Sequence, residues 1–242
     1  MTTPQDPKYA GKVVVVTGTR KGLGRMLADY FLDEGAQVIG LSRGESSISH
    51  PNYDHHRVDV GDAAAVRSVF VAISRVHGRV DIVVNNAAIL TSIHAMIMPA
   101  PRAEEMLRTN FLGVFYVSRE AAKLMRKHKF GRVINIGSMA AVLEPVGDSV
   151  YAATKAASMT LMGVLAKEFA GYGITVNTLS VSALETDMLD ELPREKVDAV
   201  IASLPIPRLA TPADIFNVVD FFASPESSYI TAQTVFLGGV HS

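Results

Sequence analysis

The sequence predicts one α/β domain in which helices cover both faces of a doubly wound parallel sheet. Signals for strands and helices alternate from one end of the chain to the other, which is the order typical of a parallel sheet. The chain has 242 residues, of which 48% are hydrophobic, so one sizeable core is expected and a second domain has little room. We therefore expect a single domain over residues 1–242.

The first strand and the first helix carry the clearest signals. Four valines at 13–16 lie between Gly11 and Gly18 and indicate a short buried strand. Beyond them, apolar residues recur at intervals of three and four and form one face of a helix that ends near Gly35. These residues are Leu23, Met26, Leu27, Tyr30 and Phe31.

The remaining elements follow from apolar runs and from the turn residues between them. A strand ends at Ser138, and further strands are expected at 37–41, 56–58, 81–84, 174–177 and 234–237. Helices are expected at 62–77, 102–127, 149–170 and 212–223. Such a sheet binds ligands at the carboxyl ends of its strands, so the residues that follow each strand are the candidates for a site.

A glycine-rich turn joins the first strand to the first helix. It reads Thr17-Gly18-Thr19-Arg20-Lys21-Gly22-Leu23-Gly24. A strand that enters a helix through glycines leaves backbone N–H groups and the positive end of the helix where a pyrophosphate can bind. The glycine spacing is one residue wider than in the usual dinucleotide fingerprint. A tight turn without a ligand is the alternative, but the position between a strand and a helix favours a dinucleotide.

Tyr151 and Lys155 lie four positions apart in a predicted helix and therefore share a face. A free tyrosine titrates near pH 10, about three units above neutrality. A nearby lysine ammonium, together with the positive charge of an oxidised nicotinamide, favours the phenolate and lowers the tyrosine pKa. Taken alone, such a pair is more often a packed ring and a solvated amine.

Four motifs in this order resemble those of the short-chain dehydrogenase/reductase family. They are the wide glycine turn, Asn85-Asn86-Ala87-Ala88 after a strand, a serine thirteen positions before a tyrosine, and Tyr-x-x-x-Lys. The match runs from about Gly11 to Gly239, and the chain looks most like bacterial 3-oxoacyl-thioester reductases. The resemblance implies a Rossmann fold and hydride chemistry on a nicotinamide cofactor.

The resemblance also implies a role for each candidate catalytic residue. Tyr151 gives a proton to a substrate carbonyl oxygen, and Ser138 hydrogen-bonds the same oxygen and stabilises the charge that develops there. Lys155 tunes Tyr151 and holds the nicotinamide ribose hydroxyls. Asn110 occupies the place of an asparagine that anchors a water in the proton relay, although it can also serve only to cap or kink a helix.

The residues after the second strand favour NADP. Enzymes of this fold that prefer NAD carry an acidic residue near this place, and none is present here. Instead, Arg43 follows Ser42 and, with Arg20 and Lys21 of the glycine turn, is expected to pair with a 2′-phosphate. A solvated loop position is the alternative for Arg43.

The resemblance assigns further cofactor contacts. Asp59 and Val60 would contact the adenine, Asn86 and Ala87 would lie beside the adenosine ribose, and Thr186 would bind the nicotinamide carboxamide. The full expected cofactor set is Gly18, Arg20, Lys21, Gly22, Leu23, Gly24, Ser42, Arg43, Asp59, Val60, Asn86, Ala87, Tyr151, Lys155 and Thr186. Two departures from the family pattern bear on the seating of the nicotinamide. Ala88 stands where members usually have glycine, and Val181-Ser182 replaces the usual Pro-Gly.

Bulk properties exclude several other classes of protein. The net charge is −1, so nucleic acid is not an expected partner, and the absence of cysteine excludes disulfides and thiolate catalysis. The histidines lack paired ligand spacing, and we expect no metal. The polar start of the chain is unlike a signal peptide, and no apolar run approaches the roughly 18 residues of a membrane span. We expect a cytoplasmic enzyme without a membrane partner.

Two segments are expected to meet the substrate. One is the loop at 91–101, and the other is the long connection at about 183–210, whose apolar residues fall at helical spacing and suggest a lid. A helix simply packed on the domain is an equal alternative for the second segment.

Partners are predicted chiefly from the resemblance. In relatives that act on acyl carrier protein, a basic residue at the place of Lys129 helps to dock the carrier, whereas a second basic place is occupied here by Tyr172. The basic run from Lys123 to Arg132 also fits a solvated helix end. Family members commonly form tetramers, so a homo-oligomer, either tetramer or dimer, is expected, with Met159, Leu161, Met162 and Leu165 facing either a partner subunit or the sheet.

Together these features predict an NADPH-dependent carbonyl reductase that acts reversibly between a ketone and a secondary alcohol. The leading substrates are 3-oxoacyl thioesters, and other small-molecule carbonyl compounds fit the same chemistry. The alternatives are a sugar or polyol dehydrogenase and a catalytically idle NADP-binding regulatory protein, the latter suggested by Ala88 and Val181-Ser182.

Overall fold

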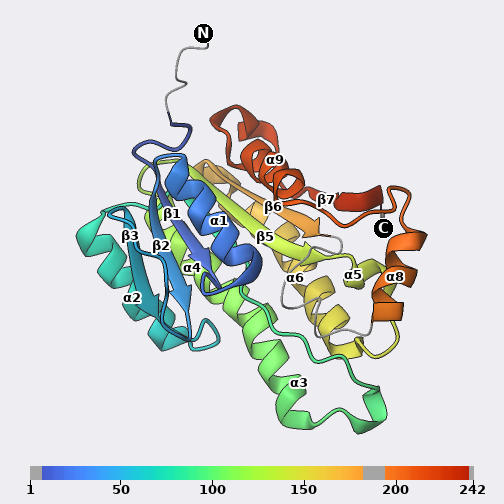
Figure 1. The fold of residues 1–242 in the computed structure, drawn as a ribbon. Coiled ribbons are helices and arrows are strands. Elements are labelled where there is room, and N and C mark those ends of the chain that lie inside the picture. The colour runs from blue at the N-terminus through green and yellow to red at the C-terminus, as the bar shows by residue number, and fades with distance from the viewer. Residues whose placement is uncertain (1–6, 182–193, 240–242) are drawn as a thin grey trace.

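A parallel sheet forms the centre of the molecule, as the sequence predicts (Figure 1). The computed structural model describes residues 7–181 and 194–239. Within these ranges the sheet has seven strands in the order β3-β2-β1-β4-β5-β6-β7, and every neighbouring pair is parallel. The chain reverses its direction of winding between β1 and β4, which is where a doubly wound sheet opens its ligand crevice.

The bounds of the elements follow in chain order. The strands are β1 Val13–Thr17, β2 Gln37–Ser42, β3 Tyr53–Arg57, β4 Ile82–Asn85, β5 Gly131–Ser138, β6 Ile174–Val181 and β7 Thr234–Phe236. The α-helices are α1 Gly22–Asp33, α2 Ala63–Val76, α3 Ala100–Leu107, α4 Gly113–Met125, α5 Ala140–Leu143, α6 Ser149–Phe169, α8 Arg194–Ser203 and α9 Pro212–Ala223. Short helical turns are η1 Ala95–Ile97, η2 Arg108–Leu112, η3 Ala170–Tyr172, η4 Pro225–Tyr229 and η5 Leu237–Gly239.

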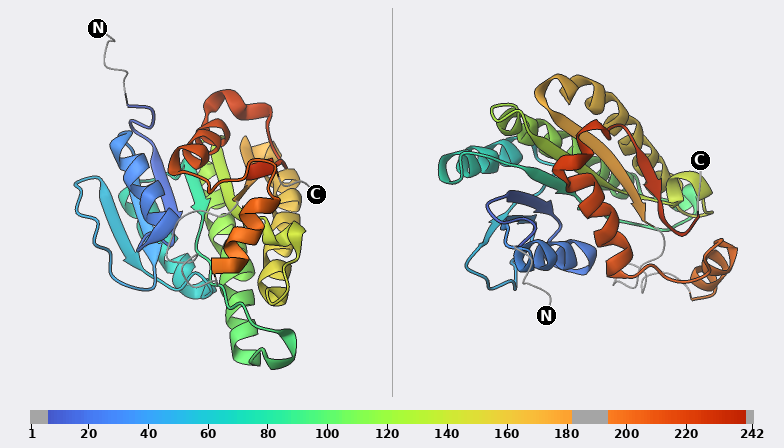
Figure 2. Two further views of the ribbon diagram at one scale, coloured as in Figure 1. Left: turned by 45° about the vertical axis from the view of Figure 1, so that its right-hand side comes forward. Right: turned by 90° about the horizontal axis from the view of Figure 1, so that it is seen from above.

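Both faces of the sheet are buried, because successive residues of a strand point to opposite sides. In β1, Val13 and Val15 pack into the core beneath α2, α4 and α6. Val14 and Val16 pack into the opposite core beneath α1 and α9. The valine run is therefore apolar at every position, and the two views in Figure 2 show the helices divided between the two faces.

Most predicted boundaries are confirmed, and two differ for physical reasons. The third strand begins earlier than expected, at Tyr53, since it is an edge strand whose residues are half-buried or exposed and carry little apolar signal. The single helix expected at 102–127 is α3 and α4 joined by the π-helical turn η2. A π-turn adds one residue to a helical turn, which sequence periodicity does not reveal.

The two substrate-side segments are only partly described. Residues 182–193, at the start of the expected lid, lie outside the described ranges, whereas α8 confirms a helix in its second half. The loop before α3 projects with that helix from the body of the domain (Figures 1 and 2). No helix in the described ranges has the length and hydrophobicity needed to span a membrane.

Three of the four apolar residues singled out in α6 pack into the core. Met162 and Leu165 are 2% and 3% exposed and belong to the core beneath α2, α4 and α6, and Leu161 packs against the same core. The alternative that these side chains face the sheet is therefore correct for them.

A polar clamp fastens the start of the described chain to α1 and α9. Tyr9 Oη donates to Asp220 Oδ1 over 2.5 Å, Tyr30 Oη donates to Asp220 Oδ2 over 2.7 Å, and the Lys8 ammonium binds the same carboxylate. The Tyr30 ring stacks on Phe216 with its centroid 4.2 Å away. Burial and the bond to Asp220 raise the pKa of Tyr30 to about 12, so the phenol stays a donor at neutral pH.

We predict that Asp220→Asn lowers the free energy of unfolding by about 1 to 3 kcal/mol, because it removes a charged acceptor shared by three donors. Urea unfolding measures the change. Asp33→Asn, at an exposed position of α1, is the control and should have little effect. Equal stability of the Asp220 variant and the wild type would contradict the clamp.

Candidate active site

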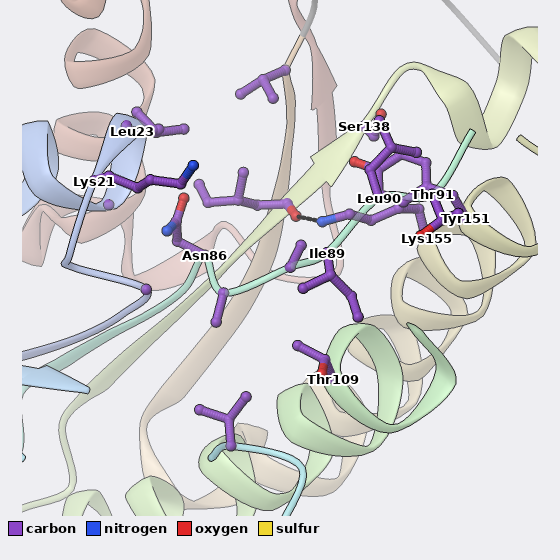
Figure 3. A pocket seen from close by; sticks show the side chains of 18 of the residues that line it. Lys21, Leu23, Asn86, Ile89, Leu90, Thr91, Thr109, Ser138, Tyr151 and Lys155 are labelled. Atoms are coloured by element: carbon purple, nitrogen blue, oxygen red, sulfur yellow. Dashed lines mark hydrogen bonds between the residues drawn. The ribbon is translucent and has the colours of Figure 1, made fainter. Parts of the chain in front are cut away.

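One large cleft opens at the carboxyl ends of the strands. Its volume is about 760 Å³, and its walls come from the turn after β1, the ends of β2, β4, β5 and β6, and helices α3, α6 and α8. Figure 3 shows Lys21, Leu23 and Asn86 on one side of the cleft and Ser138, Tyr151 and Lys155 on the other. Segments that are far apart in the sequence therefore meet along one elongated cavity.

The glycine turn leaves room for a ligand against its backbone. Gly18 has a φ of +78°, a conformation that residues with a side chain rarely adopt. A Cβ atom at Gly24 would lie 2.2 Å from the carbonyl oxygen of Gly18, so only glycine lets α1 start this close to the turn. No side chain caps the N-terminus of α1, and its first N–H groups can therefore bind an anion.

Asn86 and Thr17 join the glycine turn to the end of β4. Thr17 Oγ1 accepts from the backbone N–H groups of Asn86 and Ala87, each over 2.9 Å. Asn86 Nδ2 donates in return to the carbonyl of Thr17 over 2.9 Å. These bonds hold the two sides of the crevice together at the point where the winding reverses.

Most of the residues predicted to bind the cofactor line this cleft. They are Gly18, Arg20, Lys21, Gly22, Leu23, Gly24, Ser42, Arg43, Asp59, Val60, Asn86, Ala87, Tyr151 and Lys155. Thr186, the remaining member, lies outside the described residues. The glycine cradle and the arginines suit a dinucleotide with its pyrophosphate at the turn.

The structure adds an acidic residue that the sequence analysis missed. Glu105 of α3 accepts from Arg43 and from Arg102, with N–O distances of 2.9 Å in both cases. These hydrogen bonds, first the one from Arg43, hold the pKa of Glu105 below its usual range. Glu105 stands 62 residues after Arg43, so no local pattern could have linked the two side chains.

Ser138, Tyr151 and Lys155 meet at the other end of the cleft. Ser138 ends β5, and the first turns of α6 carry Tyr151 and Lys155, which are 7% and 5% exposed. Lys155 Nζ donates to the carbonyl of Ile136 over 2.8 Å and lies 5.8 Å from the centroid of the Tyr151 ring. The three side chains can thus act together on one group bound in the cleft.

Burial controls the protonation of this end. It raises the pKa of Tyr151, while the hydroxyl of Ser138 acts in the opposite direction and the charge of Asp148 adds to the rise. Burial lowers the pKa of Lys155 to about 8. Lys155, which the sequence analysis expected to lower the pKa of Tyr151, is not among the groups that shift this pKa, and burial is the largest cause of the rise. The part assigned to the charge of the nicotinamide stays a prediction.

Asn110 sits behind the cleft wall and is 1% exposed. It lies in the π-helical turn η2. Its side chain accepts from the N–H of Ile89 and donates to the carbonyl of Ile89, both over 2.9 Å, and it donates to Thr154 Oγ1 over 3.2 Å. Asn110 therefore positions the loop after β4 against α6, and its role in anchoring a water stays a prediction.

The substrate side of the cleft is mainly apolar and holds one buried acid. Its apolar lining comprises Ile89, Leu90, Met139, Leu143, Pro145, Val181 and Val197. Asp148, at the N-cap of α6, is 6% exposed and accepts from Ser92 of the loop after β4. The sequence carried no signal for this pair, since only the fold brings these two loops together.

Comparison with known proteins identifies the class. The sequence model of a family described as enoyl-(acyl carrier protein) reductase matches residues 18–241. The chain belongs to the short-chain dehydrogenase/reductase family, as its motifs predicted, and it is an oxidoreductase that acts on alcohol or ketone groups with a nicotinamide cofactor.

Particular relatives are similar over nearly the whole chain. It is 36% identical to a 3-oxoacyl-(acyl-carrier-protein) reductase from Vibrio cholerae, over 95% of this chain and 96% of the relative. The corresponding Escherichia coli protein is 35% identical over 96% of this chain and 97% of that protein. Among solved structures, Thermoplasma acidophilum aldohexose dehydrogenase has a TM-score of 0.87 at 27% identity and covers 97% of this chain and 95% of its own. A putative gluconate dehydrogenase from Agrobacterium tumefaciens has a TM-score of 0.88 at 26% identity, with 97% and 98% covered.

We predict that Gly24→Ala raises the NADPH dissociation constant at least about tenfold, because the added methyl group displaces the turn that holds the pyrophosphate. Fluorescence titration measures the constant. Gly163→Ala in α6 is the control, since its methyl group meets nothing within 4 Å, and it should bind NADPH like the wild type. Unchanged affinity in the Gly24 variant would show that the cofactor binds elsewhere.

Proposed function

We propose that this protein is an NADPH-dependent carbonyl reductase that converts 3-oxoacyl thioesters reversibly into 3-hydroxyacyl thioesters. The observation that carries the proposal is the meeting of Ser138, Tyr151 and Lys155 at one end of a cleft whose other end is the glycine turn. The glycine turn would hold the pyrophosphate of a dinucleotide, and Tyr151 and Lys155 at the other end of the same cleft would face its nicotinamide.

The chemistry of the three residues follows from their environment. NADPH, when bound, supplies a hydride to the carbonyl carbon of the substrate. Tyr151 donates a proton to the carbonyl oxygen, and its raised pKa keeps the phenol protonated at neutral pH, which suits reduction. Ser138 donates a hydrogen bond to the same oxygen and stabilises the developing charge. Lys155, positively charged below about pH 8, holds the ribose hydroxyls and replaces the proton that Tyr151 has given away.

The preference for NADPH rests on charge at the adenosine end. Arg20, Lys21 and Arg43 all line the cleft there, and guanidinium groups bind phosphate with paired hydrogen bonds. Glu105 holds Arg43 across the cleft, and a 2′-phosphate would compete with this carboxylate for the same guanidinium. Asp59 and Val60 lie beside them at positions that suit the adenine.

Acyl thioesters suit the apolar substrate side of the cleft, and relatives named 3-oxoacyl-(acyl-carrier-protein) reductases support this class. Docking of an acyl carrier protein is a finer part of the proposal. The register of β5 and β6 pairs Gly131 with Ile174, which places Lys129 and Tyr172 together before the amino ends of these strands, at the edge of the sheet opposite to the cleft. Lys129 offers one cation there to an acidic carrier, whereas Arg132 is buried in the domain.

We also propose that the protein forms a homo-oligomer, a tetramer or dimer, through its long helices and its last strand. The side chain of Val164 on α6 is 47% exposed, in contrast to Met162 and Leu165. This supports a face of α6 that is available to a second copy of the chain.

We predict that Tyr151→Phe reduces turnover by at least about 100-fold because it removes the proton donor and little else. NADPH binding should stay within about twofold of the wild type, since the ring remains in place. Turnover is measured by following NADPH oxidation, and the NADPH dissociation constant is measured by fluorescence titration. Tyr229→Phe, whose side chain is 98% exposed, should leave both unchanged. Full turnover in the Tyr151 variant would refute the acid role.

Oxidation of a sugar or polyol is the second candidate, and Asp148 is the observation that favours it. Asp148 lies three positions before Tyr151 and accepts from Ser92, and a hydroxyl group of a polar substrate would share this buried carboxylate with Ser92. The structural neighbours described as aldohexose and gluconate dehydrogenases are consistent with such chemistry. A 3-oxoacyl thioester has fewer hydrogen-bond donors than a sugar and gains less from the Asp148 carboxylate.

A substrate panel combined with Asp148→Asn separates the candidates. We predict that the wild type is fastest on 3-oxoacyl thioesters and that the variant keeps this rate within about threefold. Glu144→Gln, exposed in the same loop, is the control. Faster turnover of sugars, lost in the Asp148 variant alone, would favour the second candidate. Cofactor binding without turnover on any carbonyl compound would indicate an idle regulatory protein.

A further inference from the structure

A hydrogen-bond network lies beneath the adenosine end of the cleft, and its members Thr19, Ser46, Tyr53 and His55 are not among the residues that line the cleft. Tyr53 opens the edge strand β3, and its phenol reaches beneath β2 toward the glycine turn. There Tyr53 Oη lies 2.9 Å from Thr19 Oγ1, and Thr19 is fully buried. The network therefore reaches the glycine turn from the side opposite to the ligand.

Gly40 makes this reach possible. It lies in β2 and pairs with Val16 of β1 and His55 of β3. A Cβ atom at Gly40 would lie 2.1 Å from Tyr53 Oη and 2.6 Å from Thr19 Oγ1. Any side chain at this position would separate the two hydroxyl groups. The absence of a side chain at Gly40 therefore lets Tyr53 and Thr19 meet over β2.

His55 extends the network from Tyr53 to the segment after β2. A carbonyl can only accept, so His55 Nε2 donates to the carbonyl of Gly44 over 2.9 Å. In the neutral ring, Nδ1 then accepts from the Tyr53 hydroxyl 3.3 Å away. Ser46 donates to Tyr53 Oη over 3.2 Å, and Ser42 donates to the same Gly44 carbonyl over 3.0 Å. The segment 42–46 is thus bonded to Tyr53 directly through Ser46 and indirectly through His55 and the carbonyl of Gly44.

The two segments that the network joins also meet in the cleft wall. A Cβ atom at Gly44 would lie 3.0 Å from Arg20 Cδ and 3.2 Å from Arg20 Nη1, so the Arg20 side chain passes directly over this glycine. Arg20 comes from the glycine turn and Arg43 from the segment after β2. The distance between the two guanidinium groups therefore depends on the hydrogen bonds through which Tyr53 and His55 hold the two segments.

We propose that Tyr53 and His55 are positioning residues that determine the selectivity for NADPH over NADH, an inference that rests on the proposed NADPH preference. A 2′-phosphate needs cationic donors from both segments at once, and its binding is sensitive to displacements of a fraction of an ångström. NADPH and NADH both bind their pyrophosphate at the glycine turn, but only NADPH also depends on the separation between the two segments. Loosening the network therefore weakens NADPH binding more than NADH binding.

Tyr53→Phe tests the proposal because it keeps the ring and removes only the hydroxyl group. The expected result is an NADPH dissociation constant raised about three- to tenfold, with NADH changed less than about twofold. Both constants are measured by fluorescence titration, which needs no substrate, and kcat at saturating NADPH should stay unchanged. Thr19→Val removes the other end of the same contact and should repeat the effect. The double variant should show no loss beyond that of Tyr53→Phe, because the hydroxyl that Thr19 contacts is already absent there.

Tyr30→Phe is the matched control, because it also removes a bonded tyrosine hydroxyl but lies in the clamp with Asp220. It should cost stability and leave both dissociation constants unchanged. Equal weakening of NADPH and NADH in the Tyr53 variant, or no change in either, would overturn the positioning role. A wild type that binds NADH more tightly than NADPH would instead refute the proposed cofactor preference, and this result is read before any variant is made.

Discussion

The two-sided burial of the central sheet is the constraint on which the rest of this structure depends. Because Val13 to Val16 are buried on both faces, helices must cover both sides, and parallel strands must return through those helices. All the carboxyl ends then lie at one edge. Because each of them follows the carboxyl end of a strand, four segments meet at this edge: the glycine turn, the segment after β2, the loop after β4 and Ser138.

Once the strand ends meet, hydrogen bonds beneath the ligand surface set the finer geometry. Thr17 and Asn86 tie β1 to β4, Asn110 ties the loop after β4 to α6, and Tyr53 ties β3 to the glycine turn. Thr17, Tyr53 and Asn110 are not among the residues that line the cleft and lie behind them. These buried hydrogen bonds fix the relative positions of the segments that line the cleft, so no second domain is needed to hold them.

Burial also decides the protonation of the candidate catalytic pair. Removing Tyr151 and Lys155 from water opposes charge on both, so the pKa of the phenol rises and that of the ammonium falls. The sequence analysis expected a lower pKa for the tyrosine from the charges of Lys155 and of a bound nicotinamide, and the second contribution stays a prediction. The spacing placed the two groups on one face of α6 correctly, but it carried no information on how completely the surrounding loops cover them.

The fold class and the glycine turn were determined by the sequence alone, because periodicity and local spacing record them. The Ser138, Tyr151 and Lys155 constellation was also predicted, from the resemblance of its motifs to those of a known family. The edge strand at Tyr53, the π-turn around Asn110, and the partners Glu105 and Asp148 were decided only by the tertiary structure. Glu105 reaches Arg43, and Ser92 reaches Asp148, across dozens of residues. Contacts of that kind arise from the packing of whole elements, and a linear pattern has no means of recording them.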